Sequence, residues 1–300
     1  MYIGNAKYCY ANSTAMLLAS IGESVPARKL EVLTGVGLGA QMEQGLLFLD
    51  TVLPDVGITK ALKLLGFDCV ERSSEDPEQA PWDELKAVLE EGPAVLGPLD
   101  MGYLTHYPDH EYLHGADHYV LAYDIDEQNI YFHDPAGYPF TPLNLKDFEK
   151  AWRAEQIFYR RNHFRFWHAP KRVEHLTESD VYERAFTMFR NNYLSLEKSG
   201  ETVCAEAIRS LANQLKVEEP TAAIAGHLKY FMFQLGAKRA HDYALFFKKN
   251  HSTLSKHKWE QAKLLGKCHV FAAAGKWPEL SGTLDQLADE EQSFRDALLT

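Results

Sequence analysis

The stretch ADHYVLAYDIDEQNIYFHDPAGYP, residues 116–139, decides the predicted fold, because it contains two strands around a short turn. Residues 118–125 and 130–134 are rich in aromatic and branched apolar side chains, and the polar turn DEQN separates them, a pattern typical of a β-hairpin. His118 opens the first strand and Asp134 closes the second. If the strands pair around this turn, we expect the two residues to lie within about three positions of being directly opposite.

Short helices and strands surround this hairpin in the first 170 residues. The pattern predicts helices over residues 10–21, 57–67, 81–91 and 145–154, and further strands over 67–71, 93–99 and 164–169. A glycine-rich loop, GVGLGAQ, occupies residues 35–41. Helices followed by a sheet indicate an α+β domain.

The second part of the chain has the period of amphipathic helices, with apolar residues three and four positions apart. Helices are predicted over residues 177–198, 202–215, 222–249, 255–274 and 283–298. We therefore expect two domains, an α+β domain over residues 1–172 and an all-helical domain over residues 173–300.

Charge and composition exclude several classes of protein. The 300 residues are 46% hydrophobic, and a net charge of −11 argues against a nucleic-acid-binding protein. The charge is uneven: counting Lys and Arg against Asp and Glu, residues 71–134 carry −14 and residues 221–270 carry +7. Acidic surroundings favour a cationic substrate such as an amine, and the basic stretch suits an acidic partner protein.

The chain has features typical of a cytoplasmic protein that does not contact a membrane. No apolar run approaches the ~18 residues of a membrane span, and no basic segment followed by an apolar stretch opens the sequence. Its four cysteines lie at wide, irregular spacing, which does not suit a disulfide framework: Cys9, Cys69, Cys204 and Cys268.

Cys9 has the position expected of a nucleophile. It immediately precedes the first predicted helix, in KYCYANSTAMLL. The positive end of a helix dipole favours the thiolate form of a cysteine, and a thiolate with a base nearby is a competent nucleophile. A buried structural cysteine is the alternative. An imidazole such as that of His118 can act as the base, and a carboxylate such as that of Asp134 can orient it. The alternative interpretation is a surface histidine at a strand end and an aspartate in an ordinary Asp-Pro turn.

Together the three residues occur in the order found in papain-like proteins. The strings YCYANSTAMLL (8–18) and ADHYVLAYDIDEQNIYFHDPAGYP resemble those of C39-type peptidases and, more closely, the N-terminal domain of the BtrH family of butirosin-biosynthesis proteins. The glycine segment LTGVGLGAQ (33–41) and the segment GPLDMGYLTHYP (97–108) fit the same resemblance.

The resemblance implies a papain-like cysteine peptidase fold followed by the helical domain, with Cys9 as nucleophile, His118 as base and later acid, and Asp134 as the orienting group. It implies acyl transfer through a Cys9 thioester, from an acyl donor such as an acidic acyl carrier protein to a cationic amine, in specialised metabolism. A C39-like peptidase or amide hydrolase acting on a small-molecule or peptide substrate, and a non-catalytic binding module, are the alternatives. No cofactor is expected, and self-association through the helical domain is left open.

One position departs from the pattern of these families. Related enzymes commonly place a Gln six residues before the Cys for the oxyanion hole, where this chain has Ile3; Asn5 is the nearest amide side chain and is expected to take that role with the backbone N–H of Cys9.

A metal site is the competing interpretation. Four histidines recur every four residues, accompanied by two aspartates: His106, His110, His114, His118, Asp109 and Asp117. On a helix this spacing suits zinc, but Pro108 and Gly115 interrupt the segment. We therefore expect no metal.

Overall fold

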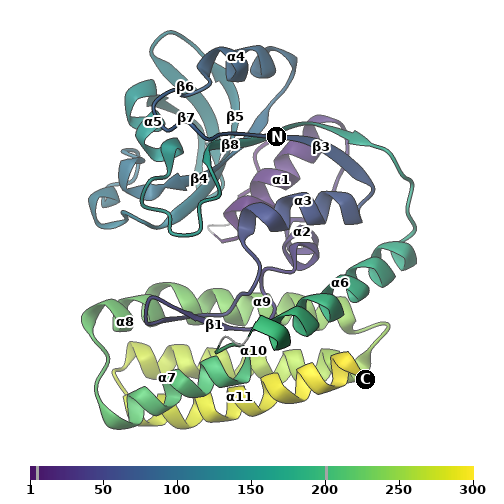
Figure 1. The fold of residues 1–300 in the computed structure, drawn as a ribbon, viewed down its shortest axis with the longest axis vertical. Coiled ribbons are helices and arrows are strands. Elements are labelled where there is room, and N and C mark those ends of the chain that lie inside the picture. The colour runs from purple at the N-terminus through teal and green to yellow at the C-terminus, as the bar shows by residue number, and fades with distance from the viewer. Residues whose placement is uncertain (5–6, 200–201) are drawn as a thin grey trace. The chain divides into compact units, whose positions relative to one another are not determined.

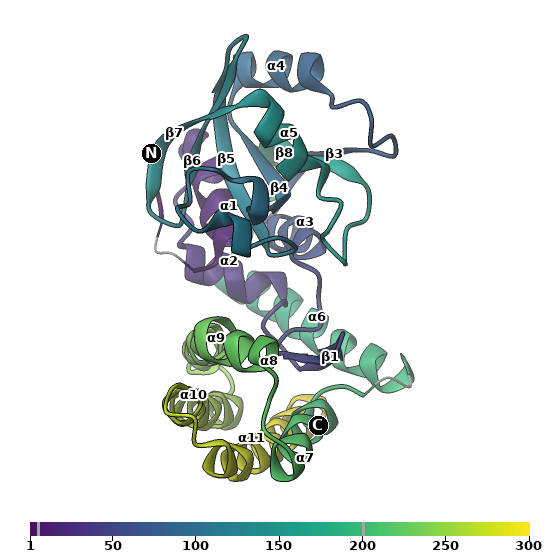
Figure 2. The same cartoon turned by 90° about the vertical axis from the view of Figure 1, so that its left-hand side faces the viewer.

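The chain folds into two compact units, seen in the computed structural model, which describes all residues except 5–6 and 200–201 (Figures 1 and 2). Each unit combines two segments, Met1–Leu30 with Pro54–Thr177 and Glu31–Leu53 with Glu178–Thr300. The expected division at residue 172 is continuous in sequence, whereas in the structure the segment Glu31–Leu53 belongs to the unit that contains the C-terminal helices.

The first unit is built on a six-stranded antiparallel sheet in the order β3-β8-β4-β5-β6-β7. Its strands are β3 (Phe67–Ser74), β4 (Ala94–Asp100), β5 (Asp117–Ile125), β6 (Asn129–Asp134), β7 (Tyr138–Asn144) and β8 (His163–Arg172). Five of these strands match strands predicted from the sequence. The sixth, β7, is not predicted, because two prolines, Pro139 and Pro142, weaken the strand signal.

The hairpin β5–β6 forms as predicted. Ile125 pairs with Ile130 beside the turn and Leu121 pairs with His133 further along. Pairing in this register brings the beginning of β5 and the end of β6 to the same end of the sheet. His118 and Asp134 are thereby positioned close together.

Helices pack against both faces of this sheet, so its central strands are buried on both sides. The helices are α1 (Cys9–Ser20), α3 (Pro54–Leu64), α4 (Trp82–Glu91) and α5 (Leu145–Arg153). Phe148 and Trp152 of α5 pack with Leu96, Val120 and other residues that alternate along the strands. Helix α1 packs on β5, where Ser13 Oγ donates to the carbonyl of Tyr119 at 3.1 Å. The nearly complete burial of α1 fixes its N-terminus against the sheet.

The second unit consists mainly of helices, most of which appear nearly end-on in Figure 2. They are α6 (Glu178–Ser199), α7 (Ala205–Val217), α8 (Ala222–His227), a π-helical turn (Leu228–Met232), α9 (Phe233–Phe247), α10 (Ser252–Ala273) and α11 (Trp277–Leu299). The predicted helix over 222–249 is thus interrupted by the π turn, and α11 begins at Trp277 rather than 283.

The segment Glu31–Leu53 contributes a small hairpin to this unit, β1 (Gln41–Glu43) and β2 (Leu46–Phe48), and helix α2 (Ala27–Thr34) precedes this hairpin in the chain. Gly37 in the glycine-rich loop packs against the Arg239 side chain so closely that a Cβ would lie 2.7 Å from it.

The structure therefore combines a mixed α/β part containing a sheet with a C-terminal helical region, in agreement with the predicted α+β class.

Candidate active site

Cys9 is the first residue of helix α1, one position before the predicted start. Tyr8 before it has a left-handed backbone conformation, φ 60° and ψ 49°, which is uncommon for a residue with a side chain. The Asn12 side chain holds this turn, since its Nδ2 donates to the carbonyls of Lys7 at 2.6 Å and Tyr8 at 3.0 Å. The turn and the buried helix together fix the position of a partly exposed thiol.

His118 and Asp134 form a buried pair beside this thiol. His118 Nε2 donates to Asp134 Oδ1 at 2.7 Å, and the backbone N–H of Ala136 donates to the same oxygen at 2.7 Å. The Asp134 side chain is fully buried and that of His118 is 6% exposed. Because Nε2 is bound to the carboxylate, the Nδ1 side of the imidazole is the one left for another partner.

Cys9 forms a further side-chain hydrogen bond with His118. Burial alone would lower the pKa of His118, but the charge and hydrogen bond of Asp134, with a further hydrogen bond to Cys9, raise it well above the ordinary value of 6.5. The structure thus brings Cys9, His118 and Asp134 into one connected group, in the order in which a nucleophile, base and orienting carboxylate are needed.

Asp134 has two further partners, which lie in the loop between β4 and β5. Its Oδ2 accepts hydrogen bonds from His106 Nε2 at 2.8 Å and from the Tyr107 hydroxyl at 2.8 Å. Burial by itself would raise the pKa of Asp134, yet the interactions with His118, His106 and the Ala136 N–H hold it well below its usual range. Burial and the nearby carboxylate raise the pKa of Tyr107, so its hydroxyl remains a donor.

The sequence pattern does not place these two residues beside Asp134, and His106 enters it only as a metal-ligand candidate. The loop that contains them has only short 3₁₀ turns, η1 (Met101–Tyr103) and η2 (His110–Tyr112), and no period from which a side-chain direction follows.

Asn5, the expected second oxyanion donor, lies outside the described residues. Ile3, which occupies the position of the usual Gln, is partly buried and has no hydrogen-bonding side chain. Cys9 itself begins α1, where the first backbone N–H groups of a helix lack intrahelical partners.

The histidine series does not form a metal site. The segment is not a helix, and its members have separate partners: His106 binds Asp134, His110 Nδ1 binds the carbonyl of Gly102 at 2.7 Å, and His114 lies 3.7 Å from Asp100. Within the described part of the chain, no three His, Cys, Asp or Glu side chains are grouped as metal ligands.

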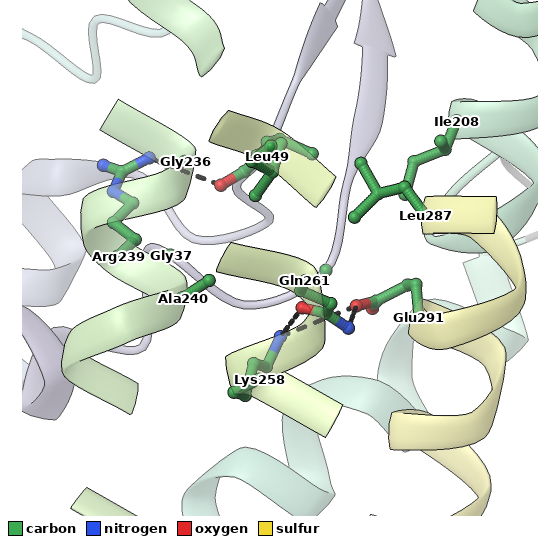
Figure 3. A pocket seen from close by; sticks show the side chains of 12 residues that line it. Gly37, Leu49, Ile208, Gly236, Arg239, Ala240, Lys258, Gln261, Leu287 and Glu291 are labelled. Atoms are coloured by element: carbon green, nitrogen blue, oxygen red, sulfur yellow. Dashed lines mark hydrogen bonds and ion pairs between the residues drawn. The ribbon is translucent and has the colours of Figure 1, made fainter. Parts of the chain in front are cut away.

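A second buried polar group lies in the helical unit, around a cavity of about 20 Å³ (Figure 3). Lys258 Nζ donates to Gln261 Oε1 at 2.8 Å, and Gln261 Nε2 donates to Glu291 Oε2 at 3.0 Å. A cavity of this size holds about one water molecule. It is therefore too small for a substrate, and its polar groups satisfy one another.

Comparison with known proteins finds separate matches for an N-terminal and a C-terminal part of the chain. Residues 37–135, which include His118 and Asp134 but begin after Cys9, match the family model described as Butirosin biosynthesis protein H, N-terminal. Residues 198–299 match the model described as YobF C-terminal domain. The chain is also 46% identical over 301 residues to the Bacillus subtilis (strain 168) protein described as "Uncharacterized protein YobF", covering 100% of this chain and 98% of that protein.

The chain belongs to the YobF family. Within it, the resemblance to BtrH N-terminal domains predicted from the motifs is confirmed, and residues 37–135 match a domain type named after a biosynthesis protein. No described helix of this YobF family member is long and apolar enough to cross a membrane.

Proposed function

We propose that this protein is a cysteine-dependent acyl-transfer enzyme with a papain-like catalytic unit. The observation that carries the proposal is the connected group Cys9–His118–Asp134, in which the thiol lies at a helix N-terminus and the imidazole is bound on its other side by a buried carboxylate. These are the parts that thiol acyl chemistry requires.

The first half-reaction forms an acyl-enzyme. The Cys9 thiol gives its proton to His118, and the thiolate sulfur attacks the carbonyl carbon of an acyl thioester or ester. Asp134 stabilises the imidazolium that forms. The tetrahedral intermediate then collapses as its bond to the leaving group breaks, the leaving thiol or alcohol takes the proton from His118, and a Cys9 thioester remains.

The second half-reaction returns the thiol. An amine acceptor attacks the thioester carbonyl while His118 accepts a proton from its nitrogen. The carbon–sulfur bond breaks, the Cys9 sulfur recovers the proton, and an amide is released. Water in place of the amine gives a carboxylic acid, so the same residues support the hydrolase alternative.

The oxyanion of each tetrahedral intermediate needs donors near the sulfur. The backbone N–H of Cys9, at the positive end of α1, is suited to this task. We propose Asn5 as the second donor, because it is the amide side chain that precedes Cys9 most closely in the sequence.

The charge distribution suggests the partners. The excess of 14 negative charges over residues 71–134, which include His118 and Asp134, favours a cationic amine acceptor by electrostatic steering. The excess of seven positive charges over residues 221–270 suits an acidic acyl carrier protein as donor.

Intact-protein mass spectrometry tests the proposal. The full chain is incubated in buffer with acetyl, butyryl and octanoyl N-acetylcysteamine thioesters, with and without ethanolamine as the amine acceptor, and water is the competing acceptor in every sample. We expect an acyl adduct that is lost in Cys9→Ala and retained in Cys69→Ala, a control thiol on the same unit. Discharge to an amide supports the transferase and discharge to acid the hydrolase. If no thioester in this set leaves an adduct that depends on Cys9, the enzymatic proposal is overturned in favour of a binding module.

A further inference from the structure

The Asp134 carboxylate is shared between two histidines, and only one of them contacts the nucleophile. Oδ1 accepts from His118 at 2.7 Å and Oδ2 accepts from His106 at 2.8 Å, while Tyr107 donates to Oδ2. A carboxylate that receives donors on both oxygens cannot rotate without breaking hydrogen bonds. The hydrogen bonds on Oδ2 therefore determine where Oδ1 lies.

The surroundings of His106 fix its tautomer. Its side chain is 10% exposed, and its Nδ1 is buried without a hydrogen-bond partner among the described residues. A proton on Nδ1 would be a buried donor with no acceptor, which is unfavourable. The hydrogen therefore resides on Nε2, which donates it to Asp134.

Aromatic rings hold the His106 imidazole in place. Its ring centroid lies 4.5 Å from that of Tyr107, 5.1 Å from Tyr138 and 5.4 Å from Phe132. The titratable groups that face this assembly are Tyr107, Tyr138, Asp134 and, beyond the carboxylate, His118 and Cys9. Among the described residues, the Asp134 carboxylate is the one group that hydrogen-bonds this ring.

We infer that His106 is a positioning residue for the catalytic group: its Nε2–H, with the Tyr107 hydroxyl, locks Asp134 so that Oδ1 is directed at His118 and Nδ1 of His118 at Cys9. This inference rests on the proposed function of Cys9. It assigns to His106 a role that acts through Asp134, without contact with substrate.

The test compares two substitutions that separate the hydrogen bond from the packing. His106→Gln keeps an N–H donor at about the reach of Nε2, whereas His106→Phe fills the aromatic surroundings but has no donor. The rate of Cys9 alkylation by iodoacetamide is measured from pH 4 to 10 on the full chain, with the alkylated residue identified by peptide mass spectrometry.

We expect His106→Phe to react about tenfold more slowly than wild type at pH 6, and the acidic limb of its pH–rate profile to move upward by about one unit, because a loosened His118 no longer favours the thiolate. His106→Gln should stay within about threefold of wild type. If His106→Phe matches His106→Gln or exceeds it, His106 serves packing only and the inference is overturned.

Two further measurements keep the result interpretable. Tyr107→Phe removes the other donor to Oδ2 and should move the acidic limb in the same direction, and it replaces His106→Phe if that variant does not fold. If wild-type Cys9 reacts no faster at pH 6 than a free thiol such as glutathione, the proposed function itself fails. If Cys9 is activated but indifferent to His106 and Tyr107, only the positioning role fails.

Discussion

His118 Nε2 lies 2.7 Å from Asp134 Oδ1, and the same imidazole also hydrogen-bonds Cys9. Both members of this pair are buried, so water does little to weaken their attraction. The charge of Asp134 is therefore the main feature that raises the pKa of His118 and favours its protonated form.

Replacing Asp134 by Asn tests this dependence. Asp134→Asn removes the negative charge but keeps the shape, so the pKa of His118 should fall towards or below its ordinary range. We expect the rate of Cys9 alkylation at pH 6 to fall by on the order of 10²-fold, measured with iodoacetamide. Asp126→Asn, in the turn of the same hairpin, is the matched control and should react like wild type. Equal rates for Asp134→Asn and its control would contradict the assigned role.

The same pair predicts how stability depends on pH. The pKa of folded Asp134 lies below the ~3.9 of an unfolded aspartate, so its ionised form adds stability above about pH 4 that is lost as the pH falls through the folded pKa. The pKa of folded His118 lies above the ~6.5 of an unfolded histidine, so its protonated form adds stability below about pH 6.5 that is lost as the pH rises through the folded pKa.

Wild type should therefore exceed Asp134→Asn in free energy of unfolding most clearly between about pH 4 and 6.5. Urea unfolding at pH 3, 5.5 and 9.5 measures this difference. A difference that is the same at all three values would show that the carboxylate stabilises the fold without the charge interaction with His118.

The turn before Cys9 depends on Asn12. Asn12→Ala removes two hydrogen bonds, to the carbonyls of Lys7 and Tyr8. These bonds hold Tyr8 in its left-handed backbone conformation. We expect a loss of about 1–3 kcal/mol in the free energy of unfolding, together with slower Cys9 alkylation. Thr14→Val is the control, because it removes one side-chain hydrogen bond, to Tyr10 in the same helix. If both variants lose stability alike and neither slows alkylation, the turn does not position the thiol.

The attachment of the segment Glu31–Leu53 to the helical unit depends on a buried ion pair. Arg239 Nε donates to Glu31 Oε1 at 2.8 Å, and Arg239 Nη1 donates to the carbonyl of Leu49 at 3.3 Å. Arg239→Met leaves the fully buried Glu31 carboxylate without this cation, so we expect a cost of about 3–5 kcal/mol.

Arg209→Met is the matched control for Arg239→Met. It breaks the exposed ion pair with Asp289 and should cost less than about 1 kcal/mol. Thermal and urea unfolding of both variants measure the comparison. Equal losses would show that the pair Glu31–Arg239 does not hold the segment in place.

Local pattern alone determined much of this protein. The hairpin β5–β6, the helix that begins at Cys9 and the amphipathic helices of the C-terminal half follow from residue periodicity and turn residues, which act over a few neighbouring positions. Because the hairpin register follows from its turn, the closeness of His118 and Asp134 was predictable too.

Tertiary structure alone decided the rest. His106 and Tyr107 reach Asp134 from an irregular loop, and no sequence period fixes the direction of side chains there. The segment Glu31–Leu53 joins the helical unit through a contact between Glu31 and Arg239, 208 positions apart. Contacts of this kind depend on how whole elements pack, because a buried charge requires a partner wherever in the chain that partner lies.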